Sequence, residues 1–286
     1  MRSPVDIELI HTIAQLRERL HPSRSAPIAL VPTMGALHTG HGTLITKAAT
    51  ETACVVVSIF VNPTQFNDPS DYQRYPRTLS TDSEFCQRHG AHIIFAPSAE
   101  EMYPEPPQTF VEVGAVSEHL CGKFRPGHFR GVATVVLKLF QIVQPDRAYF
   151  GEKDAQQLAV IQRMVRDLNV PVEIVPAPTV RESDGLAMSS RNQHLTPEQR
   201  SIAPLLYQAL QHALSTIEKG ERSAASLQQQ ALATLAVPGI RVEYLEIVDA
   251  ASMQPIETIQ TDARIAIAAW VGSTRLIDNV FVPACH

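Results

Sequence analysis

The sequence contains few cysteines and few lysines. Only four of its 286 residues are cysteine, and they are scattered with no C-x-x-C pair: Cys54, Cys86, Cys121 and Cys285. This pattern suits a reducing cytoplasm and argues against a disulfide scaffold or a cysteine-based zinc site. Lysine occurs five times, no Lys/Arg-rich run is present and the formal net charge is −5. We therefore expect no nucleic-acid partner.

Long apolar runs are also lacking. Stretches such as Cys54–Val61 are far shorter than the roughly 18 residues that a membrane-spanning helix requires. Asp6 and Glu8 stand where a secretory signal would place its apolar segment. With 44% hydrophobic and 19% charged residues, the composition is that of a globular protein with a buried core. We expect a cytoplasmic protein without a membrane partner.

Over the first two-thirds of the chain, short β-branched runs alternate with longer helical patterns. The pattern of 132–143 is apolar on all faces and that of 158–168 is amphipathic. This alternation is typical of an α/β fold with a parallel sheet, whose strands are short and almost continuously apolar. The expected strands are Ile28–Val31, Cys54–Val61, His92–Phe95, Arg147–Phe150 and Val172–Val175.

The chain changes character after the last of these strands. Residues 176–192 are rich in proline and polar residues and predict a linking loop. Thr196 and Pro197 then predict the start of a helix that continues to Gly220, and a shorter helix follows at 223–235. Three apolar segments close the chain, so we expect a small α+β domain. They are Val242–Val248, Ile265–Val271 and Leu276–Val282.

Polar residues follow four of the expected strands. In a doubly wound sheet, ligands bind outside the carboxyl ends of the strands, so these clusters should converge on one cleft. They are Pro32–His41, Asn62–Asn67, Gly151–Asp154 with Gln156 and Gln157 beyond it, and Met188–Arg191.

His38 and His41 in the first cluster are three residues apart, which places them on one face of a helix that begins there. Gly40 would let a phosphate approach the backbone, and a helix N-terminus supplies free N–H groups. A pair of ordinary histidines in a turn remains an alternative. A zinc site lacks a third ligand at a recognisable spacing, and G-A-L-H-T-G-H lacks the G-x-G-x-x-G of a dinucleotide site.

The other clusters offer donors and neutral amides. Met188–Arg191 contains two hydroxyls and a permanent cation, which suits a polyphosphate, although an ordinary turn is the alternative. Lys153 adds a cation, and Asp154 could be either a functional group or the N-cap of the next helix. Gln65 and Gln157 could bind hydroxyls or a carboxylate, although a glutamine on a loop is usually only solvated.

Together these residues resemble the HIGH-type nucleotidyltransferase superfamily. His38–His41 stand as the H-x-G-H element, and A-M-S-S-R resembles the superfamily's KMSKS-like loop. Five ordered blocks between about residues 28 and 195 resemble the pantothenate synthetase (pantoate–β-alanine ligase) family more narrowly. They are PTMGALHTGH, FVNPTQFN, YQRYPRT, RPGHFRGVATVVLKLFQIVQPDRAYFGEKDAQQL and TVRESDGLAMSSRN.

This resemblance implies an AMP-forming ligase. The carboxylate of pantoate attacks the α-phosphorus of ATP, pyrophosphate leaves, and the amine of β-alanine displaces AMP from pantoyl-adenylate. The family implies magnesium-bound ATP and a cytoplasmic homodimer. It also implies a Rossmann-like nucleotide- and pantoate-binding domain, here 1–179, and a smaller C-terminal domain, here 180–286, that covers the active site.

The resemblance also assigns roles to residues. The catalytic positions are His41 (the family's proton-donor position), His38, Lys153, Ser189, Ser190 and Arg191. The ATP-binding positions are Met34, Gly35, Ala36, Leu37, His38, Thr39, Gly40, His41, Gly151, Glu152, Lys153, Asp154, Val180, Met188, Ser189, Ser190 and Arg191. The positions for pantoate and β-alanine are Gln65, Gln157, Asn62 and Tyr75.

Some points stay open at the level of sequence. Gly42 follows the H-x-G-H element where the family usually has a large apolar residue, and glycine would cost the first helical turn up to about 1 kcal/mol. No residue is an obvious base for the β-alanine amine. The protein ligands of Mg²⁺ are unknown, with Asp82 and Asp154 as candidates. Another nucleotidyltransferase, an aminoacyl-tRNA synthetase and a non-catalytic nucleotide sensor are the rival interpretations.

Overall fold

The structure is a computed structural model that describes residues 7–284, so Asp6 and Cys285 lie outside the described residues. The chain divides into two compact units. The first unit comprises the residues up to 113 together with 125–152 and 160–178. The second unit comprises 114–124, 153–159 and the chain from 179 onward. The two short inserts show that the second unit draws on segments that precede residue 179.

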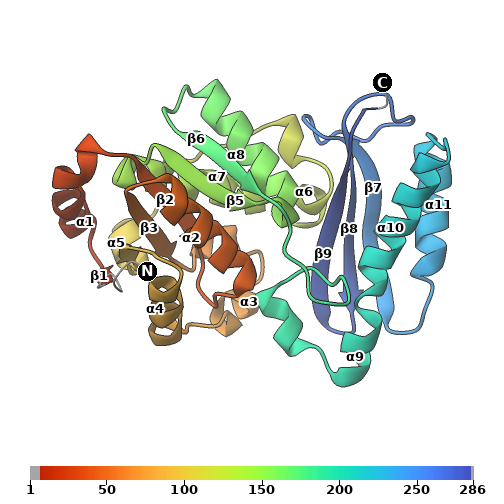
Figure 1. The fold of residues 1–286 in the computed structure, drawn as a ribbon, viewed down its shortest axis with the longest axis horizontal. Helices are drawn as coiled ribbons and strands as arrows, with labels where there is room; N and C mark the ends of the chain where they lie inside the picture. The colour runs from red at the N-terminus through yellow and green to blue at the C-terminus, as the bar shows by residue number, and fades with distance from the viewer. Residues whose placement is uncertain (1–6, 285–286) are drawn as a thin grey trace. The chain divides into compact units, whose positions relative to one another are not determined.

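The first unit is built on a six-stranded sheet in the order β1-β4-β3-β2-β5-β6, and every pairing is parallel (Figure 1). The predicted Rossmann-like parallel sheet is therefore confirmed. One strand was not expected from the sequence, namely β1, which pairs with β4. The strands are β1 Glu8–Ile10, β2 Ile28–Thr33, β3 Cys54–Ile59, β4 Ile93–Phe95, β5 Arg147–Gly151 and β6 Glu173–Ala177.

Helices connect these strands and bury both faces of the sheet. On one face, alternate residues such as Val31 and Val57 pack in a single apolar core with Ile45 of α2 and Cys86 of α4. Helix α7 contacts β2 and α1, and most of its residues are buried, as its uniformly apolar pattern predicts. The helices are α1 Ile13–Leu20, α2 Thr39–Glu51, α3 Pro69–Arg74, α4 Leu79–Arg88, α5 Ala99–Met102, α7 His128–Val143 and α8 Ala155–Asp167.

The strand order fixes where a ligand site can form. The chain passes from β2 to β3 and β4 on one side, and from β5 to β6 on the other. The order therefore reverses between β2 and β5, which pair through Ala29 with Arg147 and Leu30 with Ala148. Ligands of doubly wound sheets bind at such a switch point. The turn that opens α2 and residues Gly151 and Glu152 follow these two neighbouring strands.

The second unit contains an antiparallel sheet of β7 Ile240–Asp249, β8 Ala263–Val271 and β9 Thr274–Val282. Helices α10 Leu205–Glu218 and α11 Ala224–Thr234 pack on this sheet (Figure 1). Residues such as Leu210 and Leu227 form its apolar core with Ile267. The expected α+β character of this region is confirmed.

The sequence predicted one helix from Pro197 to Gly220, and this prediction is wrong. Helix α9 covers only Pro197–Ile202, and α10 starts after Pro204. Proline lacks the N–H that a continuous helix would bond to the carbonyl four residues earlier, and its ring crowds that turn. The predicted N-cap is correct, since the Thr196 side chain accepts from the Gln199 N–H in a capping box.

Residues 176–192 are more ordered than the predicted linking loop. Strand β6 extends to Ala177, and residues 180–188 fold back on themselves as a hairpin. Within it Met188 N–H donates to the Val180 carbonyl at 2.9 Å, and Gly185 turns the chain with a φ of +92°. This segment, residues 180–188, is called the 180s hairpin below.

The cysteines within residues 7–284 are all unpaired and buried. Burial raises the pKa of the Cys86 thiol to about 12, so it stays protonated. Among these residues, no helix combines the length and the apolar character that crossing a bilayer requires.

Candidate active site

The N-terminus of α2 is closed by two histidines. His38 is the N-cap, and its Nδ1 accepts the Gly40 N–H at 3.2 Å. His41, at the third helical position, accepts the His38 N–H at its own Nδ1 at 3.3 Å. The two rings lie 4.1 Å apart, centroid to centroid. This is a capping box in which imidazoles replace the usual Ser/Thr and Glu/Gln.

The capping box fixes the tautomer of both neutral rings. Because each Nδ1 accepts a backbone N–H, the proton of each neutral imidazole lies on Nε2. His38 and His41 therefore keep Nε2–H as a donor group at a helix N-terminus, where the macrodipole already favours an anion. The helix begins at Thr39, as the sequence predicted, and the two imidazoles lie together.

Gly42, the departure from the family pattern, is explained by its neighbour. A Cβ built on Gly42 would lie 2.6 Å from Cε1 of the His89 ring, so the imidazole already occupies the space of a side chain. His89 follows α4, and its Nδ1 lies 3.0 Å from Oγ1 of Thr46. Burial, with a smaller contribution from Arg88, lowers the pKa of His89. The first turn of α2 is intact, with Gly42 N–H donating to the His38 carbonyl.

We expect Gly42→Ala to lower the midpoint of thermal unfolding, although alanine is the better helix former by about 1 kcal/mol. The added methyl group would displace the His89 ring. The double variant Gly42→Ala/His89→Ala should recover most of the loss, because the space is then vacated. Differential scanning calorimetry of the two variants and of His89→Ala alone measures this. A midpoint that rises in Gly42→Ala would contradict the packing argument.

The loop between β2 and α2 is held by a buried carboxylate. Gly35 and Ala36 have φ angles of +85° and +50°, a left-handed conformation that carries strain for alanine. Asp82 of α4 accepts the Ala36 N–H at 3.0 Å and the Leu37 N–H at 2.8 Å, and also binds the Thr78 hydroxyl at 3.0 Å. Asp82 is therefore engaged in holding the loop that leads to His38.

A cavity of about 240 Å³ lies beside this loop in the first unit. Its wall includes Met34, Gly35 and Asp82. The residues at the carboxyl ends of β3 and β4, together with Tyr72 and residues 76–79, also line it. The four positions assigned to pantoate and β-alanine are not among its lining residues.

Asn62 and Gln65 follow β3 and meet Met34, the residue directly after β2. The Asn62 amide donates to Gln65 Oε1 at 3.1 Å, and the Gln65 amide lies 3.1 Å from the Met34 sulfur. Both polar residues are buried, at 1% and 8% exposure. Tyr103 donates its hydroxyl to Asn62 Oδ1 at 3.0 Å, and burial raises the pKa of this tyrosine. The structure thus brings together three of the predicted site residues.

Helix α7 fixes the backbone that carries Gln65. The carbonyl of Gln65 lies 2.9 Å from His128 Nδ1 and accepts from Arg125 Nη2 at 3.2 Å. Gly131 packs so closely that a Cβ there would lie 2.5 Å from the Thr64 carbonyl oxygen. Tyr75, the fourth predicted position near the substrate, lies edge-on to the ring of Phe66, 5.9 Å between centroids.

Gly151 and Glu152 belong to the first unit, whereas Lys153, Asp154 and Gln157 belong to the second. Lys153 Nζ lies 3.8 Å from Asp154 Oδ2, a carboxylate whose side chain is 48% exposed. Gln157 is half-buried.

The second unit also carries the phosphate-binding segment predicted at Met188–Arg191. Ser189 is the N-cap of a short 3₁₀ turn, Ser190–His194, and its hydroxyl oxygen accepts the Arg191 N–H at 3.2 Å. Within residues 7–284, no hydrogen bond or ion pair engages the Arg191 guanidinium. Val180 lies at the other end of the 180s hairpin, where its carbonyl binds Met188.

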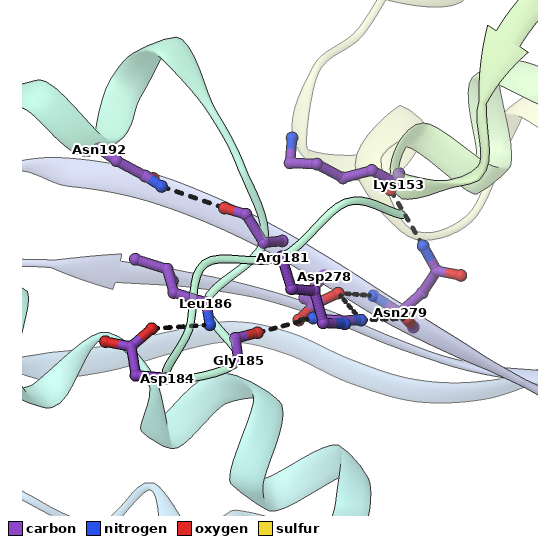
Figure 2. Close-up of polar contacts among 9 residues, drawn as sticks. Lys153, Arg181, Asp184, Gly185, Leu186, Asn192, Asp278 and Asn279 are labelled. Carbon is purple, nitrogen blue, oxygen red and sulfur yellow. Dashed lines mark hydrogen bonds and ion pairs between the residues drawn. The ribbon is translucent and has the colours of Figure 1, made fainter. Parts of the chain in front are cut away.

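An ion pair ties this hairpin to β9, as Figure 2 shows. Arg181 donates to both carboxylate oxygens of Asp278, at 2.6 and 2.9 Å. Burial raises the pKa of Asp278, while the Arg181 charge opposes this effect. Asn279 donates from its side chain to the Lys153 carbonyl at 3.0 Å.

Sequence reasoning found the polar residues at the strand ends but missed the residues that hold them. No local sequence pattern indicates which glycines pack closely against a neighbouring backbone. Nor does any pattern indicate hydrogen-bond partners that lie far apart along the chain. The C-terminal third offered no motif at all. Asp82 was considered only as a magnesium ligand, and its bonds to the Ala36 and Leu37 N–H groups were not foreseen. The missed residues are His89, Tyr103, Arg125, His128, Gly131, Arg181, Asp278 and Asn279.

Comparison with known proteins identifies relatives over almost the whole chain. The sequence profile of the pantoate-beta-alanine ligase family matches residues 8–281. Pantothenate synthetase of Moorella thermoacetica is 52% identical over 277 residues, which is 96% of this chain and 98% of the relative. Pantothenate synthetase of Pseudomonas putida strain GB-1 is also 52% identical, with 96% of each chain covered.

Solved structures agree with the sequence relatives. Pantothenate synthetase from Thermus thermophilus superposes with a TM-score of 0.91 at 48% identity, covering 96% of this chain and 98% of that one. Pantoate-beta-alanine ligase from Francisella tularensis, solved with β-γ ATP and β-alanine, superposes with a TM-score of 0.78 at 37% identity. The coverage there is 96% of this chain and 97% of the other.

Proposed function

The chain belongs to the pantoate-beta-alanine ligase family, and on that premise we propose how its own residues carry out the reaction. The family joins pantoate and β-alanine at the expense of ATP. One observation carries the assignment of residues, namely the capping box of His38 and His41, which places the proton of each neutral imidazole on Nε2 at the N-terminus of α2.

In the first step, a pantoate carboxylate oxygen bonds to the α-phosphorus of ATP, and the bond from that phosphorus to the pyrophosphate oxygen breaks. Negative charge grows on the α-phosphate oxygens and on the leaving pyrophosphate. The Nε2–H groups of His38 and His41, with the N–H groups of the α2 N-terminus, stabilise this charge without a permanent cation. Lys153, Ser189–Arg191 and the loops around Gly151 and Val180 bind the remainder of ATP.

The Arg191 guanidinium, which has no partner among the described residues, supports this assignment, because a phosphate would supply the missing acceptors. Met34–Leu37 form the wall next to the nucleotide.

Gln65, Asn62, Gln157 and Tyr75 bind pantoate and β-alanine in this proposal. Neutral amides suit the task, since a strong ion pair would stabilise the attacking carboxylate and reduce its reactivity. In the second step, the β-alanine nitrogen, which enters as an ammonium group, gives two protons to solvent and bonds to the acyl carbon, while the bond from that carbon to the AMP oxygen breaks. The acyl-adenylate is hydrolysed easily, so water has to be kept from it until the amine arrives.

Magnesium enters with the nucleotide in this proposal. Among residues 7–284, no cluster of three or more His, Cys, Asp or Glu side chains is placed to hold a metal ion. Asp82 already accepts two backbone N–H groups, and the Asp154 side chain is about half exposed. Mg²⁺ often keeps several waters and binds mainly through substrate phosphates, which fits a site without a protein cage.

We also propose a cytoplasmic homodimer. The buried, unpaired cysteines suit a reducing compartment. Phe110, which carries the guanidinium of Arg130 3.9 Å from its ring centroid, is among the large apolar side chains that remain exposed. Light scattering of the purified protein measures the oligomeric state, and a monomer mass would contradict this part of the proposal.

The activity test is the exchange of labelled pyrophosphate into ATP. We expect exchange when pantoate is present, even without β-alanine, because the first step is reversible and needs only these two substrates. Exchange driven by another acid would favour a different nucleotidyltransferase. ATP binding without exchange under any acid would favour a nucleotide sensor.

A further inference from the structure

Strand β9 carries two adjacent polar residues, one bonded to the 180s hairpin that leads into Ser189–Arg191 and the other bonded to the Lys153 carbonyl. Asp278 binds Arg181, and Asn279 binds Lys153, as Figure 2 shows. Both β9 residues are buried, with exposures of 4% and 5%. Buried polar residues in a sheet are costly unless they are fully bonded, so their presence here calls for a role.

The Arg181 side chain is fixed on every side. Besides the two bonds to Asp278, it donates to the Gly185 carbonyl at 3.0 Å and to the Asn279 carbonyl at 3.4 Å. Its guanidinium carbon lies 3.7 Å from the ring centroid of Tyr207. A bidentate pair of this kind sets orientation as well as distance.

Because Arg181 is held in place, the 180s hairpin is held too, and this hairpin leads directly into Ser189–Arg191. Arg181 pairs with Ala187 across the hairpin, and Val180 binds Met188 next to it. Asn192 donates to Glu182 Oε1 at 2.7 Å and to the Ala187 carbonyl, which closes the far side of the segment. Ser189–Arg191 therefore lie between two anchored points.

Asn279 holds the backbone of Lys153 from the same strand. Its amide nitrogen binds the Lys153 carbonyl, and its amide oxygen accepts from Arg264 at 2.7 Å. Because the nitrogen and the oxygen of the amide are both bonded, its orientation is determined. The Asn279 side chain cannot change rotamer without losing a hydrogen bond.

We propose that Asp278 and Asn279 are positioning residues for the ligase reaction, which hold the Ser189–Arg191 segment and Lys153 at a fixed separation before ATP binds. This inference rests on the proposed phosphate-binding role of those two segments. Donors that are preorganised around a developing charge need no rearrangement during the reaction, so losing the fixed separation should lower the rate.

The sheet offers a matched control for Asp278. Glu243 and Arg275 form another buried ion pair, with side-chain exposures of 11% and 14% against 3% and 18% for Asp278 and Arg181. Among the described residues, neither Glu243 nor Arg275 is bonded to Lys153 or to residues 180–191. Asp278→Asn and Glu243→Gln should both lower the unfolding midpoint, since each leaves an arginine without its counter-charge.

Only Asp278→Asn should slow pantoate-dependent pyrophosphate exchange, by about 10- to 100-fold and with the pantoate KM unchanged. The exchange rate of Glu243→Gln should stay within about twofold of the wild-type rate. A change of that size is smaller than the effect of losing one well-placed donor. Equal losses of rate in the two variants would overturn the inference. Wild-type protein without exchange would instead overturn the proposed function.

Asn279→Ala provides a milder second variant and a test of coupling. If Asn279 acts through Lys153, then Asn279→Ala should slow exchange in the wild type but have little further effect in Lys153→Ala. Additive effects in the double variant would show that Asn279 does not act through Lys153 and would overturn this half of the inference.

Discussion

We expect His41→Ala to lower the rate of pantoate-dependent pyrophosphate exchange by about 10²–10³-fold, which is the cost of removing one well-placed donor to a developing charge. The pantoate concentration for half-maximal rate should change little, because Gln65 and Asn62 are untouched. Steady-state exchange rates at varied pantoate measure both quantities.

The capping box makes a second variant informative. His41 also accepts the His38 N–H, so alanine removes part of the cap of α2 as well as the imidazole. His41→Gln keeps that bond, because glutamine at the third helical position binds back to the N-cap. We expect His41→Ala to lose about 0.5–2 kcal/mol of stability as well as activity, and His41→Gln to lose activity alone.

A glutamine variant with the wild-type exchange rate would contradict the role of the imidazole. An alanine variant that loses no stability would contradict the cap. The two outcomes are independent, so thermal unfolding and exchange assays on the same pair of proteins separate the structural role of His41 from its chemical role.

Gly131→Ala should destabilise the protein by about 1–3 kcal/mol, the usual range for an overpacked site. Helix propensity alone predicts the opposite sign, a gain of up to about 1 kcal/mol from replacing glycine inside α7. The contact decides the outcome, because the new methyl group would lie 2.5 Å from the Thr64 carbonyl oxygen and 2.8 Å from the Gln65 Cα. Backbone atoms cannot move aside as a flexible side chain can.

The same substitution should raise the KM for pantoate. The methyl group would push away the backbone that carries Gln65. The Asn62 amide would also lose its bond to the Gly131 carbonyl, which is 3.2 Å long in the wild type. Chemical denaturation and pantoate titrations of Gly131→Ala and of the wild type measure the effects. A Gly131→Ala protein more stable than the wild type would show that α7 can shift away from η2 (Pro63–Gln65).

Most strands of the sheet in the first unit could be predicted from the sequence, because each is marked by a local pattern of residues. Runs such as Cys54–Ile59 are apolar on both faces and are bounded by polar residues, so their ends were predicted to within about two residues. Strand β1 was not predicted because it has only three residues and begins with the charged Glu8. The break at Pro204 was overlooked because the apolar pattern on both sides of it remains helical.

The candidate site was predicted only in part, and the reason is physical. His38, Gln65 and Lys153 follow strands, so their positions can be deduced from the strand order. Asp82 binds Leu37 across 45 positions of sequence, and Asn279 binds Lys153 across 126. Such partners are chosen by the packed fold, and no local spacing encodes them.

The strand order has a consequence for how this chain is made. Four adjacent strands, β1, β4, β3 and β2, are complete once the ribosome has passed Phe95. The partner on the other side of β2 starts only at Arg147. During translation the hydrophobic edge formed by Ile28–Val31 stays without its neighbour until about fifty more amino acids emerge, which is the kind of exposed edge that promotes aggregation. Nascent chains stalled in this interval should therefore be a preferred target for chaperones.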